Sequence, residues 1–393
     1  MRVVGVIAEY NPFHLGHAYH LAEARRLASA DAVVAVMSSV FTQRGDAAIC
    51  SPADRARMAL ASGADAVFAL PAVWAVRDAE HFALGGVALL AGLGCSAICF
   101  GTETADLASL QEAARLLETP DADFSADVHS RMEAGIPYPA AVSAAMDARL
   151  PGCGALLEKP NSTLAICYLR AMIKLDVNME VIPVQRCGEY HDSALGEALP
   201  SATALRGAIL RGDWDKVKSA MSEEAYAVLR DAAAQGHIHR PEALDPALLY
   251  RLRTMTCADY AALPDVSEGI ENRLDSAAGT ARTREELLQS AKTRRYPYAR
   301  LSRLATHALL RLTDADLAMM EFPQAAWLLG FRKEARELFA HFKAHGTLSI
   351  LSKAADFDRN IPWFAAEMRA YDIWALGAGL PAGLALTQGV TIL

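Results

Sequence analysis

Short apolar runs rich in β-branched residues alternate with helix-like stretches along the first hundred residues, and this alternation constrains the fold more than any other feature. Strands are expected at Val3–Ala8, Ala32–Met37, Ala66–Leu70 and Ser96–Phe100. One helix start is marked by Ser51, the N-cap of a Ser-Pro-Ala-Asp segment. Because strands that alternate with helices build a parallel sheet covered on both faces, the pattern predicts an α/β fold with a Rossmann-like, doubly wound parallel sheet.

The sheet domain extends beyond these strands. A helix at Asn161–Leu175 and a further strand at Val181–Gln185 continue the alternation, and helical periodicity before them, near residues 105–155, indicates a helical insertion. From about Gly212 onward the pattern is almost wholly helical. We therefore expect a first domain over residues 1–211, which includes the insertion, and a second, mainly helical domain over residues 212–393.

Composition narrows the class of protein. The chain carries 38 Lys and Arg against 46 Asp and Glu, a net charge of −8, which excludes a uniformly basic nucleic-acid coat but allows a local basic patch. Its 7 cysteines contain no Cys-x-x-Cys pair, so neither a zinc ribbon nor a disulfide framework is indicated. The chain enters its first strand without a secretory signal and has no long uncharged apolar run, so we expect a cytoplasmic protein with no membrane partner.

The strongest functional signal lies between the first strand and the first helix, where residues 8–17 are Ala-Glu-Tyr-Asn-Pro-Phe-His-Leu-Gly-His. In open α/β sheets a nucleotide phosphate meets the amino end of a helix at this position. Gly16 lets the backbone approach the phosphate, and His14 and His17 can direct donors at it. The sequence has no Walker loop or Gly-x-Gly-x-x-Gly turn; a His-x-Gly-His here is typical of nucleotidyltransferases that attack the α-phosphate of ATP. The alternative is that both histidines only cap the helix.

A second motif begins a later helix. In residues 200–206, Pro-Ser-Ala-Thr-Ala-Leu-Arg, two hydroxyls stand at the amino end of the helix and an arginine one turn in, which suits the β- and γ-phosphates of a departing pyrophosphate. The segment resembles the Ser-x-Thr-x-x-Arg signature of the same superfamily, although this spacing is also common in helix capping. His14, His17 and Arg206 are therefore the candidate catalytic residues, and Ser201 and Thr203 are candidate ATP ligands.

One segment reverses the acidic balance of the chain. Residues 282–303 contain seven basic and two acidic residues, a local net charge of +5, with tyrosines among them. Clustered positive charge attracts nucleic-acid phosphates, and aromatic rings can stack on unpaired bases. The alternative is a solvated helical face. The candidate RNA-binding residues are Lys292, Arg294, Arg295, Tyr296, Tyr298, Arg300 and Arg303.

Taken in order, these motifs resemble those of the bacterial tRNA(Met) cytidine acetate ligase family, within the His-x-Gly-His nucleotidyltransferase superfamily. The matching segments are Gly5–His17, Met37–Gly45, Gly63–Asp65, Leu70–Pro71, Phe100–Glu103, Asn161–Ser162, Arg186 and Ile270–Leu274, and the likeness extends beyond Thr306. The chain departs from the family pattern in three places: Leu15 replaces Asn, Ser39-Val40 replaces Gly-Asn, and Thr102 replaces Ser.

The resemblance implies a ligase with two steps. Acetate and ATP give acetyl-adenylate and pyrophosphate, and the acetyl group then passes to the N4 amine of the wobble cytidine of elongator tRNA(Met), with the basic segment as the tRNA-binding surface. Mg²⁺ is expected beside ATP, with its ligands unidentified; Glu9 and Asp65 either help to hold it or are buried carboxylates bonded to backbone. The family's ATP contacts carry over to Ile7, Ala8, Glu9, Tyr10, Asn11, Pro12, Phe13, His14, Leu15, Gly16, His17, Ala18, Tyr19, His20, Gly101, Asn161 and Arg186.

Two other functions stay open on the sequence alone. A small-molecule adenylyltransferase would share the nucleotide motifs, but its product would keep the AMP. A non-catalytic RNA-binding protein with a nucleotidyltransferase-like fold would keep the basic segment without the chemistry.

Overall fold

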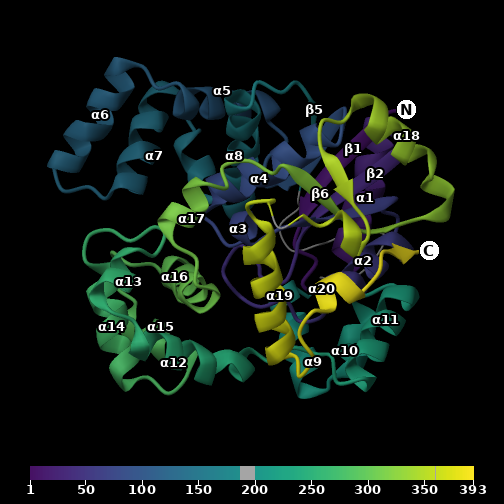
Figure 1. Ribbon diagram of the computed structural model, residues 1–393. Coiled ribbons are helices and arrows are strands. Elements are labelled where there is room, and N and C mark those ends of the chain that lie inside the picture. The colour runs from purple at the N-terminus through teal and green to yellow at the C-terminus, as the bar shows by residue number, and fades with distance from the viewer. Residues whose placement is uncertain (186–199, 359) are drawn as a thin grey trace.

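A central sheet organises the computed structural model, which describes residues 1–185, 200–358 and 360–393 (Figure 1). Its parallel part has the order β5-β4-β1-β2-β3. These strands are β1 (Val3–Ala8), β2 (Ala32–Ser38), β3 (Ala66–Leu70), β4 (Ala97–Thr102) and β5 (Glu180–Gln185). The predicted α/β fold with a doubly wound parallel sheet is confirmed, and each predicted strand is present to within one or two residues.

The central strands β2 and β3 are buried on both faces. Every residue of β2 and β3 is buried, as expected for near-continuous apolar runs between layers of helices. The helices between the strands are α1 (Leu15–Ala28), α2 (Pro52–Ala61), α3 (Ala72–Ala75), α4 (Ala79–Gly92) and α8 (Pro160–Lys174). Strand order reverses between β1 and β4, and the carboxyl ends of strands at such a reversal are where open α/β sheets commonly bind ligands.

The expected insertion is a set of helices before α8. It comprises α5 (Leu107–Glu118), α6 (Ala122–Glu133), α7 (Tyr138–Arg149) and a 3-10 turn at Gly154–Glu158. In Figure 1, α6 and α7 project from the body of the molecule on the side away from the N-terminus.

A second apolar core lies outside the sheet, among helices that we call the helical unit. These are α12 (Asp245–Thr254), α13 (Cys257–Ala261), α14 (Ile270–Thr280), α15 (Arg284–Ala291) and α16 (Tyr298–Leu310). Its buried residues run from Leu248 to Ala308 and include Leu274, Leu287 and Leu301. The separate helical core is therefore narrower than the expected second domain at residues 212–393.

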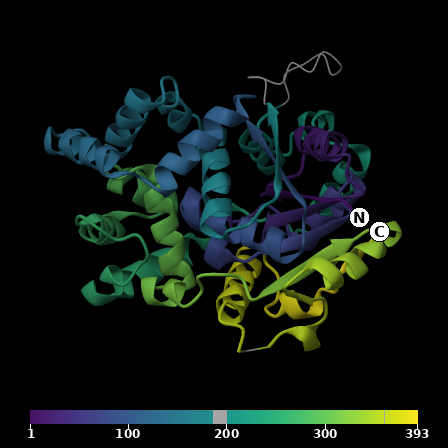
Figure 2. The ribbon, with the colours of Figure 1, turned by 90° about the horizontal axis from the view of Figure 1, so that it is seen from above.

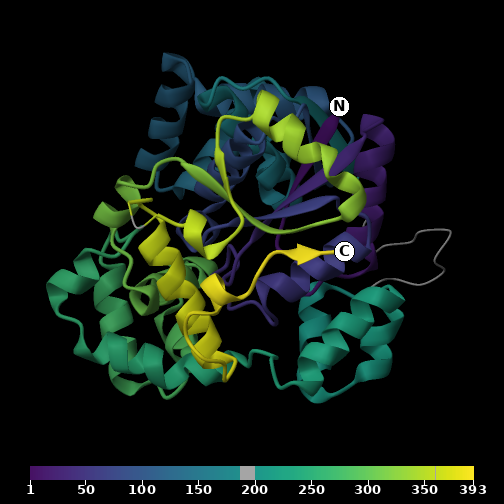
Figure 3. The same cartoon turned by 45° about the vertical axis from the view of Figure 1, so that its right-hand side comes forward.

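The segments on either side of the helical unit pack with the sheet instead. Helices α9 (Ala202–Arg211), α10 (Trp214–Ser219) and α11 (Glu223–Ala234) share the sheet's apolar core, and Figure 3 shows them apart from the helical unit. After α17 (Asp314–Ala318), strand β6 (Ala325–Phe331) joins β3 in antiparallel orientation. Strands β7 (Ser349–Leu351) and β8 (Thr391–Ile392) then pair with β6.

The three C-terminal strands were not expected within the mainly helical second half. The β6 sequence, Ala-Ala-Trp-Leu-Leu-Gly-Phe, is one apolar run without alternation, so periodicity cannot distinguish a buried strand from a buried helix. The remaining elements are α18 (Glu337–His345), α19 (Phe364–Gly377) and α20 (Leu384–Thr387), with 3-10 turns at Pro241–Leu244, Lys333–Ala335 and Ala354–Asp356. Figure 2 shows this C-terminal segment along one edge of the sheet. In the described part of the chain, no helix is both long and apolar enough to cross a membrane.

Candidate functional site

The two histidines of the first motif form a reciprocal cap at the amino end of α1. The backbone N–H of Gly16 donates to His14 Nδ1 at 3.1 Å, and the N–H of His14 donates to His17 Nδ1 at 3.2 Å. The rings stack with their centroids 3.8 Å apart. Because Nδ1 of each ring accepts a hydrogen bond, the proton of each neutral imidazole lies on Nε2. The capping role is therefore real, and it fixes both rings in the tautomer that can donate through Nε2.

Aromatic packing holds this pair in place. The rings of Tyr10 and Phe13 are almost fully buried and lie 4.9 Å and 5.5 Å from the ring of His17. Tyr10 has a positive φ of 47°, a conformation that non-glycine residues adopt only where packing enforces it. The chain therefore turns sharply from β1 into α1, and the cap stands at the carboxyl end of the central strand.

The other expected contacts of this motif follow from the same turn. Ile7 and Ala8 end β1, while Pro12 is buried in the turn. Leu15 donates its N–H to the carbonyl of Ala220 at 2.9 Å. The first turns of α1 carry Ala18, the exposed Tyr19 and His20.

The second motif lies directly against the first. Arg206 Nη1 donates to the carbonyl of Asn11 at 2.8 Å, and its Nη2 donates to Thr203 Oγ1 at 3.1 Å. Ser201 is the N-cap of α9, where its Oγ accepts from the N–H of Ala204 at 3.2 Å. Ser201 and Thr203 are both exposed. The fold thus brings together two motifs that are far apart in sequence, with their hydroxyls and guanidinium beside the histidine turn.

Glu9 has a structural partner on the loop after β2. Its Oε1 accepts from the N–H of Gln43 at 2.6 Å, and burial raises the pKa of its carboxyl above the ordinary value despite this bond. The backbone on either side is held by Arg55, which is fully buried and donates to the carbonyls of Glu9 and Ser38 at 2.8 Å and 2.9 Å. Sequence reasoning missed Arg55 because it stands within an ordinary helix pattern.

At the end of β4, Glu103 bonds to the start of α8. Its carboxylate accepts from the N–H and Nδ2 of Asn161 and from the N–H and Oγ of Ser162, at 2.6 to 3.0 Å. Burial alone would raise the pKa of Glu103, but these hydrogen bonds outweigh it and lower the pKa to about 2. Asn161 therefore has a structural partner, and Gly101 is half-buried one strand position before Thr102. Arg186 lies outside the described residues.

Asp65 proves to be a buried structural carboxylate. It precedes β3, at the amino edge of the sheet opposite to the histidines, where it accepts from the N–H of Val33 at 2.7 Å and pairs with Arg25. Of its two alternatives, the structural one is confirmed. Within the described ranges, no group of three or more His, Cys, Asp and Glu residues is arranged to hold a metal ion.

Some side chains of the basic segment are exposed, and others bond to residues within the protein. Lys292, Arg294 and Arg295 are exposed, although Arg295 also pairs with Glu268 at 2.8 Å. Arg300 Nη2 donates to the Asp265 carbonyl at 2.6 Å. Arg303 is half-buried, and this burial lowers the pKa of its guanidinium.

The two tyrosines of the basic segment are engaged within the protein. Tyr296 is 7% exposed, its ring belongs to the core of the helical unit, and its hydroxyl donates to the Glu268 carbonyl at 2.5 Å. The ring is therefore already packed within the protein, and the expected stacking of Tyr296 on a base stays a prediction. Tyr298 donates its hydroxyl to Glu285 Oε2 at 2.6 Å. The available basic surface is the edge that carries Lys292, Arg294 and Arg295.

Known proteins resemble this chain over almost its whole length. A family model described as HIGH Nucleotidyl Transferase matches residues 1–380. The chain is 34% identical over 377 residues to the tRNA(Met) cytidine acetate ligase of Geobacillus sp., covering 94% of this chain and 93% of that protein. It is 36% identical over 378 residues to the protein of the same name from Anoxybacillus flavithermus, with the same coverage of 94% and 93%. Its fold matches the crystal structure of Thermotoga maritima TmcAL bound with alpha-thio ATP with a TM-score of 0.91, at 26% identity and 100% coverage of both chains.

Proposed function

The chain belongs to the HIGH nucleotidyl transferase family and, within it, to the tRNA(Met) cytidine acetate ligases, and from this premise we propose that it activates acetate with ATP and acetylates elongator tRNA(Met). The observation that carries the proposal is the joining of two motifs at the carboxyl end of β1. There the stacked pair of His14 and His17 lies beside Arg206, which is bonded to the same turn. Histidine and guanidinium donors at the amino end of a helix can bind the phosphates of a nucleoside triphosphate.

In the first step, a carboxylate oxygen of acetate attacks the α-phosphorus of ATP, the acyl–phosphate bond forms and pyrophosphate leaves. Catalysis of this kind consists mainly of positioning and charge stabilisation. The Nε2–H groups of His14 and His17 serve as fixed donors to the phosphoryl oxygens. Arg206, with Ser201 and Thr203 on α9, stabilises the departing pyrophosphate.

In the second step, the N4 amine of the wobble cytidine attacks the acyl carbon, loses a proton and releases AMP. The tRNA is held by the exposed basic edge at Lys292, Arg294 and Arg295, whose charges neutralise phosphates. We place this reaction in the cytoplasm, where ATP and tRNA meet.

Mg²⁺ enters with the nucleotide in this proposal. This ion keeps several waters and is commonly bound through substrate phosphates with one or two carboxylates. Glu9, which directly follows β1 and precedes the histidine turn, is the carboxylate that would help to hold such an ion. When bound, the ion would neutralise charge on the phosphates.

ATP–pyrophosphate exchange tests the proposal without RNA. We expect exchange that requires both acetate and the protein. A small-molecule adenylyltransferase would exchange only when its own acceptor replaces acetate and would leave AMP on that acceptor, whereas a non-catalytic RNA-binding protein would give no exchange with either. Either result would contradict the proposal.

A further inference from the structure

The loop after β2 connects the helical unit to the nucleotide site. We call residues 39–50 the β2 loop; it is closed by a bridge between Phe41 and Ala47. At its tip, the hydroxyl of Thr42 donates to the carbonyl of Asp46 at 3.2 Å and accepts from the N–H of Asp46 at 3.3 Å. The tip is therefore a small, internally bonded unit.

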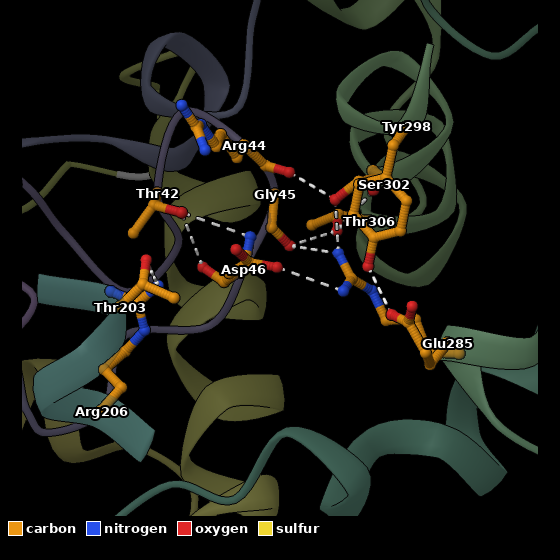
Figure 4. Close-up of polar contacts among 11 residues, drawn as sticks. Thr42, Arg44, Gly45, Asp46, Thr203, Arg206, Glu285, Tyr298, Ser302 and Thr306 are labelled. Carbon is orange, nitrogen blue, oxygen red and sulfur yellow. Dashed lines mark hydrogen bonds and ion pairs between the residues drawn. The ribbon is translucent and has the colours of Figure 1, made fainter. Parts of the chain in front are cut away.

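Residues of the helical unit donate hydrogen bonds to this tip from one side, as Figure 4 shows. Ser302 on α16 donates to the carbonyl of Arg44, and Thr306 donates to the carbonyl of Gly45 at 2.6 Å. Arg284 on α15 donates to three acceptors. They are Asp46 Oδ1 at 3.2 Å, the Gly45 carbonyl at 3.1 Å and Ser302 Oγ at 2.6 Å.

The contact is too close for a side chain at Gly45. Gly45 has a φ of +81°, and a Cβ there would lie 2.9 Å from both the backbone oxygen of Ser302 and the hydroxyl of Thr306. Helices α15 and α16 are themselves braced by the bond from Tyr298 to Glu285. The β2 loop therefore fits against one fixed surface of the helical unit.

The other side of the same loop reaches the nucleotide site. Gln43, next to the gripped residues, donates its N–H to Glu9 and its Nε2 to the carbonyl of Arg77 at 2.7 Å. Further along, the N–H of Ile49 donates to Asn11 Oδ1 at 2.8 Å, and the carbonyl of Asn11 is the acceptor of Arg206. The loop thus bonds to the turn that carries the histidine pair at two points.

We propose that Arg284 is a positioning residue for adenylate formation, which couples the helical unit to the nucleotide site through the β2 loop. This inference rests on the proposed function and adds that the helical unit is needed for the first step even when no tRNA is present. Although Arg284 belongs to the basic segment, its side chain is only 21% exposed and three acceptors occupy its guanidinium. Arg284 is therefore poorly placed to bind a phosphate and well placed to hold the β2 loop in position.

The test compares Arg284→Ala, Arg284→Lys and Thr306→Val with Arg282→Ala, an exposed arginine two residues away, as the matched control. Acetate-dependent ATP–pyrophosphate exchange is measured without tRNA. We expect Arg284→Ala to lower kcat about tenfold or more, because small misplacements of positioning groups are costly, while KM for ATP changes little. Arg284→Lys should recover part of kcat by reaching one of the acceptors.

Thr306→Val removes the contacts of the hydroxyl with the carbonyls of Gly45 and Ser302 while it keeps the side-chain shape, and it should lower kcat by about threefold. Because Arg284 and Thr306 share the Gly45 carbonyl as acceptor, the double variant should lose less than the product of the two single losses. If Arg284→Ala merely unfolds the protein, ATP binding and kcat should instead fall together, and Arg284→Lys should not restore kcat.

The outcomes separate this inference from the proposed function. If the wild type shows no acetate-dependent exchange, the proposed function fails. If the wild type is active and Arg284→Ala exchanges normally but binds tRNA more weakly, Arg284 serves the RNA and the inference is overturned. The inference would also be overturned if Arg284→Ala lowers kcat and raises KM for ATP together, and Arg284→Lys does not restore kcat.

Discussion

In the proposed function His14 has both a structural role as a helix cap and a chemical role as a donor to the phosphates, and two substitutions separate them. In His14→Ala, the acceptor for the N–H of Gly16 disappears together with the Nε2–H donor. In His14→Asn, the amide oxygen can take over the cap, since asparagine is among the best N-cap residues, but the side chain ends short of the Nε2 position. The pair therefore measures the cap and the donor independently.

The expected magnitudes follow from these two roles. Loss of an N-cap costs about 1 kcal/mol of stability, so His14→Ala should unfold at lower denaturant concentration while His14→Asn stays within about 0.5 kcal/mol of the wild type. Loss of a fixed donor to developing charge costs about 100-fold in kcat, which both substitutions should show. His17→Gln should behave like His14→Asn, because glutamine at the third helical position completes a capping box.

Acetate-dependent ATP–pyrophosphate exchange measures the donor, and urea unfolding followed by circular dichroism measures the cap. Near-normal exchange by the stably folded His14→Asn would refute the assignment of Nε2 as a donor to the phosphates. Equal destabilisation by the two substitutions would refute the cap analysis.

Three further predictions concern the rest of the molecule. Hydrogen bonds hold the pKa of Glu103 at about 2, below its ordinary value of 4.5, so its contribution to stability is present above pH 4.5 and is lost as the pH falls toward 2. Because the side chain is partly exposed and solvent screens its charge, Glu103→Gln should cost about 1 kcal/mol at pH 7 and less at pH 3, as measured by denaturant unfolding. Replacing Lys292 and Arg294 with alanine should weaken tRNA binding and reduce the slope of log affinity against log salt by about one unit per lost phosphate contact, and an unchanged slope in filter-binding assays would exclude them from the interface. Tyr296→Ala should lose about 3 to 5 kcal/mol of stability as a core truncation, whereas Tyr296→Phe should lose about 1 kcal/mol and bind tRNA normally; tRNA affinity that falls in the well-folded Tyr296→Phe would argue for a direct contact.

The parallel part of the sheet and the histidine turn could be predicted from sequence because their signals are local. β-branched runs such as Ala32–Ser38 alternate with capped helices, and Ser51 does cap α2 by accepting from the N–H of Asp54 at 3.1 Å. The position of His14 and His17 between β1 and α1 is likewise a feature of neighbouring residues.

The rest depends on contacts between distant residues. Strand β6 could not be recognised, because its pairing partner β3 lies more than 200 residues away and its own residues fit a buried helix equally well. The sequence shows the positive charge of the basic segment but not which of its side chains are buried. Tyr296 packs in a core, and Arg284 bonds to the β2 loop. Arg55 carried no sequence signal at all, since its acceptors are backbone carbonyls at the ends of two strands.

Nucleoside mass spectrometry tests the central claim most directly. The protein is incubated with elongator tRNA(Met), ATP and isotopically labelled acetate, and in parallel with tRNA and acetyl-coenzyme A but no acetate or ATP. We predict labelled N4-acetylcytidine at the wobble position in the first reaction and none in the second, because the proposed reaction activates a free carboxylate with ATP. Unlabelled cytidine in the first reaction, or acetylated cytidine from acetyl-coenzyme A alone, would contradict the account.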